Sequence, residues 1–260
     1  MDEVKDLLET IIRIGNELEG KSSLIPSLLR TYRPSKDFKI VKECNSGLIQ
    51  LPSASRKYLR TSLFDVIANR RSRRNFSKEG FIYLDELAAI VYASVGTTKT
   101  VDGIYGMKSY PLRASPSTGG LNCVDLVVAY SVRDLDPGIY YYNYRDHVLC
   151  KVCIPCFSYI LVHEAITQSM FVDSAVVIVF VANLCRGLWK YGIRFYKYCL
   201  IDIGIAAENA HLACTVASLL STMVAGFDKH KVAKINIRLQ NFTTRELRAT
   251  SLILVVGGHE

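Results

Sequence analysis

The sequence has 260 residues, of which 50% are apolar and 22% are charged. This composition excludes a disordered chain and allows one full-size hydrophobic core or two small ones. The net charge of +8 suits an anionic small ligand, a nucleic acid or an anionic membrane surface. The longest apolar run, Ala175–Ala182, is too short to span a bilayer, and the N-terminus shows no signal-peptide pattern. We therefore expect a cytoplasmic protein.

Residues 1–61 are expected to form a helix over Asp2–Leu18 and then an arm over Lys21–Ser55, which lies on the surface or on a partner subunit. Apolar spacing predicts the rest of an α+β fold, with helices wrapped on a small sheet. The expected helices are Ser62–Asn69, Leu84–Ser94, Phe157–Met170 and Arg194–Leu220. The expected strands are Leu126–Ser131, Gly138–Tyr144, His147–Val152, Ser174–Val181 and Ser251–Val256. Between them, Gly96–Pro116 is predicted to be a long loop.

A cluster of four arginines and one serine, Arg70-Arg71-Ser72-Arg73-Arg74, follows the helix predicted over Ser62–Asn69. Each guanidinium offers a rigid fork of donors that matches phosphate oxygens in pairs. At the end of a helix such side chains can converge on one anion. The alternatives are a solvated basic turn or a contact with nucleic acid.

Three further segments need an explanation together with the cluster. A turn rich in hydroxyls and glycine, Arg113–Gly120, can present backbone N–H groups and hydroxyls to a polar ligand. An aromatic and basic segment, Trp189–Tyr198, precedes and enters the long apolar helix, and Val224–Phe227 follows that helix. A flavin-free module that binds nucleic acid would leave these three segments unexplained.

In this order the four segments resemble the nitroreductase superfamily of flavin enzymes, and within it the SagB-type dehydrogenases, which include thiazole and oxazole oxidases. Gly138–Tyr142 with His147–Leu149 is similar to the family's GlYxY…HxL stretch, and Asp202–Asn209 looks like its (E/D)xGHxxQN helix. The resemblance runs from Ser62 to Val256. It implies a nitroreductase-like, mostly antiparallel sheet wrapped by helices, with residues 62–260 forming the FMN-binding domain of a homodimer whose flavin sites lie at the interface.

The resemblance also implies which residues bind FMN. Arg70, Arg71, Ser72 and Arg74 correspond to the family's phosphate and ribityl site. Pro116, Ser117, Thr118 and Gly119 correspond to the segment that reaches the flavin from the other subunit. Ala225 and Gly226 correspond to the turn near flavin N5.

Lys190-Tyr191 matches a Lys-Tyr pair of the SagB-type azoline oxidases, where it is thought to help remove a proton as the flavin takes hydride. A lysine can act as a base if burial or a nearby cation lowers its pKa. The alternative is that the pair merely lines an aromatic wall. Arg194 is expected to anchor this segment or an anionic substrate group.

The sequence departs from the family pattern at several positions. Gly204-Ile205 stands where the family has Gly-His, Glu208-Asn209 where it has Gln-Asn, and Asp125 ends a stretch that is Tyr-Pro-x-Glu in the family. These departures concern the substrate more than the flavin.

Eight cysteines show no spacing typical of a secreted disulfide scaffold, so we expect reduced thiols. Cys150-x-x-Cys153-x-x-Cys156 lacks the fourth cysteine of a ferredoxin motif, and only His163 could complete a zinc site. We therefore predict no metal.

The function expected from the sequence is an FMN-dependent dehydrogenase acting on a peptide azoline or a related heterocycle. The alternative is a nitro or quinone reductase that takes electrons from NAD(P)H.

Overall fold

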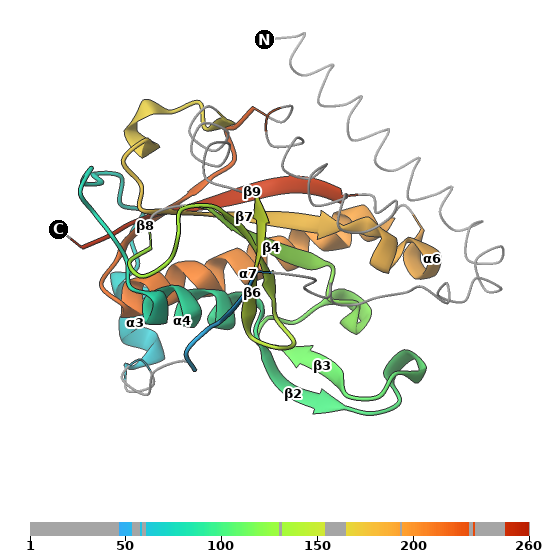
Figure 1. Cartoon of the computed structure of the whole chain (residues 1–260). Coiled ribbons are helices and arrows are strands. Elements are labelled where there is room, and N and C mark those ends of the chain that lie inside the picture. Colours follow the sequence, from blue (N-terminus) through green and yellow to red (C-terminus); the bar gives the residue numbers. More distant parts are fainter. Residues whose placement is uncertain are drawn as a thin grey trace, which may run out of the picture.

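The computed structural model describes residues 47–53, 58, 61–129, 132–153, 165–192, 194–228, 231 and 248–259, so the helix expected over Asp2–Leu18 lies outside them. The core is a seven-stranded sheet of order β1-β6-β5-β4-β7-β9-β8 (Figure 1). Each pair of neighbours in it is antiparallel. The strands are β1 (Leu48–Gln50), β4 (Val124–Ala129), β5 (Ile139–Asn143), β6 (Val148–Cys153), β7 (Val176–Asn183), β8 (Leu220–Val224) and β9 (Arg248–Gly257).

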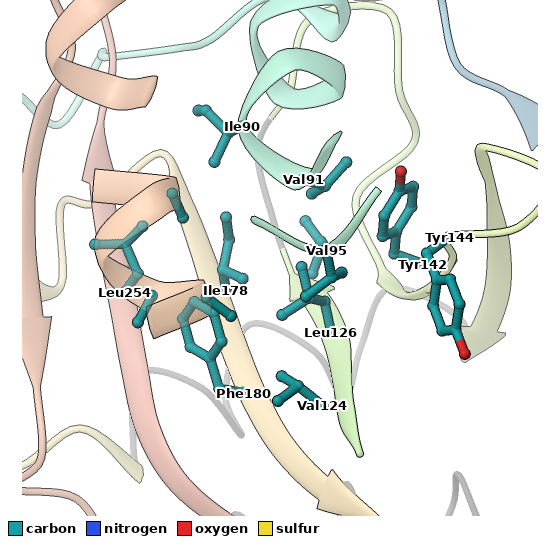
Figure 2. Close-up of a cluster of buried hydrophobic side chains, with 14 of the residues drawn as sticks. Ile90, Val91, Val95, Val124, Leu126, Tyr142, Tyr144, Ile178, Phe180 and Leu254 are labelled. Atoms are coloured by element: carbon teal, nitrogen blue, oxygen red, sulfur yellow. The ribbon is translucent and has the colours of Figure 1, made fainter. Parts of the chain in front are cut away.

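Alternation along the strands divides the core between the two faces of the sheet. In β7, Ile178 and Phe180 join the larger buried cluster, whereas Val177 and Val179 join a smaller cluster on the opposite face. Figure 2 shows the larger cluster, in which strand residues meet side chains of α4 (Leu84–Val95). The continuous apolar run of β7 is therefore explained by burial on both faces.

The long helix α7 (Arg194–Val216) covers the sheet at β7, β8 and β9 and also contacts α4. Its buried alanines, Ala206, Ala207 and Ala210, allow this close approach, and the Ser94 hydroxyl donates a hydrogen bond to the Ala206 carbonyl at 2.9 Å. By length and composition α7 could cross a membrane. Its buried face packs on the sheet as a core helix does.

Two shorter helices flank α7. One is α3 (Leu63–Asn69), and the other is α6 (Leu188–Tyr191), which directly precedes α7. Figure 1 shows α3 and α6 at opposite ends of α7. Short 3-10 turns also occur at Ile104–Gly106, Thr118–Gly120, Ser169–Phe171 and Leu184–Arg186.

The structure confirms the α+β, mostly antiparallel architecture but corrects several predicted elements. Gly96–Pro116 is not a loop, because it holds an antiparallel hairpin of β2 (Thr97–Val101) and β3 (Tyr110–Arg113). The β-branched residues of Thr97–Val101 favour a strand, but the glycines that follow made the segment look irregular.

The long helix also ends earlier than Leu220. It stops at Val216, Ser218 adopts a left-handed conformation with φ of 60°, and the chain then enters β8. Leu220 is apolar enough to extend the helical pattern, which hid this edge strand. In the described part of Phe157–Met170, Ile166 forms a bridge with Phe227 and a 3-10 turn begins at Ser169. Those residues are therefore not one continuous helix.

Part of the predicted arm belongs to the sheet of its own chain. Within Lys21–Ser55, β1 pairs with β6, and Leu51 is buried. The expected sheet was small, whereas the observed one has seven strands because β1 and β8 extend it at its two edges.

Candidate functional site

The arginine segment leaves α3 and runs beside the edge strand β8. The backbone N–H of Arg73 donates to the Ser221 carbonyl at 2.9 Å. The side chains of residues 71–75 are exposed, and a cavity of about 420 Å³ opens between Ser72, Arg73, Arg74, Asn75 and Leu220. A cavity with two guanidinium groups and a hydroxyl on its wall can hold a phosphate.

The four arginines are not equivalent. Arg71 donates from Nη1 to the carbonyls of Ala68 and Arg70, at 2.9 and 2.7 Å, so it satisfies the last turn of α3. Arg70 Nε lies 3.7 Å from Glu208 Oε1 on α7. Arg73, which was not among the predicted ligands, lines the cavity instead.

A histidine lies beneath this segment. The Nδ1 atom of His211 is 3.9 Å from Glu208 Oε2, and the ring lies against the backbone of Arg71 and Ser221. Burial lowers the pKa of His211, with Arg70 acting in the same direction and Glu208 against it. A neutral His211 leaves the arginines as the dominant charge here.

Ala225 and Gly226, the predicted turn near the flavin, follow β8 directly and are exposed. The Gly226 carbonyl accepts a hydrogen bond from Thr167 Oγ1 at 3.1 Å. The arginines lie beside the start of the edge strand β8, and this turn follows its end. Because β8 has five residues, the two are about 16 Å apart along the strand. We call Arg70–Asn75 with Ala225 and Gly226 the arginine region.

The predicted turn Pro116–Gly119 is held by a single carboxylate. The buried Asp202 of α7 accepts from Ser117 Oγ at 3.1 Å, from Thr118 N at 2.9 Å and from Thr118 Oγ1 at 3.0 Å. The thiol of Cys123 also donates to it, at 3.3 Å. A hydrogen bond to Cys199, burial and Asp202 together raise the pKa of Cys123, so this donor stays protonated.

Lys190 and Tyr191 lie against the end of that turn. Gly119 has a φ of 62°, and any Cβ there would collide with the Tyr191 hydroxyl. The Lys190 ammonium lies 5.2 Å from the centre of the Tyr191 ring, and that ring stacks on Phe195. The structure therefore brings together the predicted turn and the predicted Lys-Tyr pair.

A tyrosine that sequence reasoning missed completes this group. Lys190 Nζ donates to the Tyr105 hydroxyl at 2.9 Å, and the Tyr105 hydroxyl donates to the Gly119 carbonyl. Partial burial pulls the pKa of Lys190 down, but Tyr105 and Tyr191 outweigh it and raise that pKa above its usual value. This is the opposite of the lowered pKa that a lysine base needs. We call Ser117–Gly120 with Tyr105, Lys190 and Tyr191 the lysine–tyrosine region.

A buried ion pair supports this region from below. Arg186 Nη1 lies 2.8 Å from Asp125 Oδ1, and their side chains are 3% and 0% exposed. Asp125 also accepts from Tyr141, and Arg186 bonds to the Asn122 carbonyl. The pair joins β4 to the turn that leads into α6. Asp125 stands where the family has glutamate, and this departure was the only sequence signal for it.

The two regions are separated within one chain. Asp202 and Glu208 are six residues apart on α7, about 9 Å along its axis. Figure 1 shows α3, where the arginines begin, and α6, which carries Lys190, at opposite ends of α7. Among the described residues of one chain, the two regions therefore contact different parts of α7.

Among the described residues no group of three metal-binding side chains occurs. Cys150 is disulfide-bonded, which differs from the reduced thiol that we expected. Cys123, Cys185, Cys199 and Cys214 are in the thiol form, with no disulfide bond.

Comparison with known proteins decides the family. The sequence profile of the Nitroreductase family matches residues 67–239. The chain belongs to the nitroreductase family. It is 27% identical over 190 residues to the "Putative nitroreductase" of Methanocaldococcus jannaschii, which is 72% of this chain and 88% of that protein.

Solved structures show the same nitroreductase fold. A crystal structure named a "putative nitroreductase" from Ralstonia eutropha superposes with a TM-score of 0.62 at 23% identity, over 87% of this chain and 97% of that one. A chain of the E. coli microcin synthetase McbBCD complex, with truncated pro-MccB17 bound, superposes with a TM-score of 0.61 at 16% identity, over 86% and 79%.

Members of the nitroreductase family are FMN-dependent oxidoreductases, so the chain is an enzyme of this class and its cofactor is FMN. The arginine region fits that cofactor. Its cavity is lined by two cationic side chains and by the Ser72 hydroxyl, which are the groups that recognise a phosphate.

Proposed function

We propose that this nitroreductase is a SagB-type dehydrogenase, which oxidises a peptide azoline or a related C–N or C–S heterocycle. The observation that carries the proposal is the placement of Lys190 and Tyr191 against Gly119, at the end of the turn that the family uses to reach the flavin. An aromatic wall needs no ammonium group at this point. The fold shared with a chain of a peptide-bound synthetase complex agrees with a peptide substrate.

For the cofactor, we propose that Arg73, Arg74 and Ser72 hold the phosphate, because they line the cavity. Arg70 precedes these residues in the chain and is held near Glu208. Arg71 instead donates to a carbonyl at the end of α3. The exposed turn of Ala225 and Gly226 is proposed to lie near flavin N5, as the resemblance implies. FMN, when bound, supplies the acceptor for a hydride.

We propose a homodimer, in which the lysine–tyrosine region of one chain meets the arginine region of its partner. Two observations support this assembly. The two regions of one chain lie at different ends of α7, and α7 itself exposes apolar residues, with Ile201 at 53%. A large exposed apolar patch typically marks a protein interface. The cytoplasm is the proposed location.

Removing a hydride leaves the substrate with a proton to lose. Lys190 is held as an ammonium, so it is a donor and not a resting base. The Tyr191 hydroxyl then gives its own proton to solvent as its oxygen takes the proton of the substrate, and the Lys190 ammonium, 5.2 Å from the centre of the Tyr191 ring, stabilises the negative charge that passes through this oxygen. The pair therefore works as a cation and an acceptor in our proposal.

The test is the double variant Lys190→Ala/Tyr191→Phe, assayed with an azoline-containing peptide in air. FMN should stay bound, seen as flavin absorption at about one FMN per chain, while turnover falls by about 100-fold or more. Full turnover in the double variant would remove the pair from the mechanism. Rapid bleaching of the flavin by NADH or NADPH without oxygen, with no azoline oxidation, would favour the reductase alternative.

A further inference from the structure

The hairpin of β2 and β3 carries a connection, residues 102–109, that folds back onto the lysine–tyrosine region. Gly103, Tyr105, Gly106 and Ser109 all have positive φ, between 51° and 89°. For tyrosine this left-handed conformation is unfavourable and has to be maintained by its surroundings. The Asp102 carboxylate accepts from the Ser109 N–H at 2.7 Å, and the Gly103 N–H donates to the Met107 carbonyl at 2.9 Å.

The unusual backbone places the Tyr105 side chain at a junction. Its ring meets Trp189 edge to face, with centroids 5.7 Å apart, and lies 5.8 Å from the ring of Tyr110. Its hydroxyl touches two elements at once, the Gly119 carbonyl of the turn and the Lys190 ammonium of α6. The ammonium also lies 5.1 Å from the centre of the Tyr105 ring.

The hydroxyl has one proton, which it donates to Gly119. Toward Lys190 it can therefore only accept, and it fixes the direction of that bond. The Tyr191 side chain also bonds to the Lys190 ammonium. Tyr105 adds a link that Tyr191 does not make, because its hydroxyl ties the ammonium to the Gly119 carbonyl of the turn.

We propose that Tyr105 is a positioning residue of this active site, whose hydroxyl holds the Lys190 side chain between the Ser117–Gly120 turn and Tyr191. The proposal rests on the proposed function of Lys190 and Tyr191. It assigns the hairpin connection, which contains none of the motifs that carry the family resemblance, a role in the chemistry of the pair.

Tyr110 offers a matched control on the same hairpin. Its hydroxyl donates to the Gly120 carbonyl, one residue further along the same turn, and it has no contact with Lys190 among the described interactions. Tyr105→Phe and Tyr110→Phe therefore remove the same type of bond to the same turn. Only the first removes a partner of Lys190.

The experiment follows the titration of Lys190 by NMR in protein labelled with ¹³C-lysine, with the Lys190 signal identified by its loss in Lys190→Ala. We expect this signal to titrate at lower pH in Tyr105→Phe than in the natural protein, and to be unchanged in Tyr110→Phe. An unchanged titration in Tyr105→Phe would overturn the proposal. Equal shifts in both variants would also overturn it, because anchoring of the turn would then explain them.

The pH profile of turnover in the FMN-loaded enzyme gives a second measurement. The alkaline limb that depends on Lys190 should move to lower pH in Tyr105→Phe and stay in place in Tyr110→Phe. The two proposals can fail separately. Retained turnover in Lys190→Ala/Tyr191→Phe would refute the catalytic pair, whereas the NMR titration tests Tyr105 without any turnover.

Discussion

The arginine region and the lysine–tyrosine region are held in different ways. In the arginine region the backbone is anchored at Ser221, while most of the side chains extend into solvent around a cavity. In the lysine–tyrosine region the side chains bond to one another and to the turn, through Asp202, Tyr105 and Lys190.

This difference separates two tasks. Exposed guanidinium groups are ready to exchange water for a phosphate, and binding energy then orders them. Groups that must act on a reacting bond need to be in place beforehand, and surrounding bonds provide that order. The comparison predicts that mutations in the first region weaken cofactor binding, whereas mutations beneath the second reduce stability.

The largest expected effect comes from the buried ion pair beneath the lysine–tyrosine region. Arg186→Met removes the partner of the fully buried Asp125. We expect the free energy of unfolding to fall by about 3–5 kcal/mol, because an uncompensated charge stays buried. Urea unfolding measures the loss. The double variant Arg186→Met/Asp125→Asn should recover part of it, and no recovery would show that packing, and not charge, sets the cost.

Cofactor binding is the next test, and it concerns the arginine region. In Arg73→Ala/Arg74→Ala we expect the affinity for FMN to fall by about 100-fold, since two charge-assisted contacts to phosphate are lost. Stability should change by less than about 1 kcal/mol, because both side chains are exposed. FMN fluorescence titration measures binding. Lys99→Ala/Lys108→Ala removes the same charge from the exposed hairpin, and an equal loss there would point to net charge alone.

The two regions also differ in how far the sequence predicted them. The arginine segment was evident from four guanidinium groups beside a helix end, a local pattern. Which arginines line the cavity was not predictable, because that depends on β8, which was not predicted as a strand and whose first residue, Leu220, was assigned to the preceding helix. Arg73 was missed for this reason.

In the lysine–tyrosine region, resemblance supplied Lys190 and Tyr191, but not Tyr105. The proposed role of Tyr105 depends on a hairpin that brings it into contact with Gly119, 14 positions further along the chain. It also depends on the left-handed backbone conformation of Tyr105. Asp202 was read as part of a helix motif and not as the anchor of the turn. Long-range contacts of this kind leave no periodic trace in a sequence.

A moderate effect is expected where α7 holds the turn. Asp202→Asn keeps the shape of the side chain but sets an NH₂ group against at least one of the donors from Ser117 and Thr118. We expect a loss of about 2 kcal/mol in unfolding free energy. Thermal unfolding at neutral pH measures it. Asp173→Asn, an exposed carboxylate, is the control and should change stability little.

The smallest expected effect is a pH dependence centred on His211, beneath the arginine region. Burial lowers its pKa in the folded chain, with Glu208 and Arg70 as the charged groups that face it. The unfolded chain then binds the proton more readily, so stability is fully present above about pH 6.5 and falls as the pH drops below that value. Urea unfolding between pH 5 and 8 should show the free energy of unfolding falling toward acid pH. In His211→Asn this pH dependence should be weaker, whatever the stability of the variant at pH 8. An unchanged slope would assign the acid sensitivity to another group, such as His147, whose pKa burial also lowers.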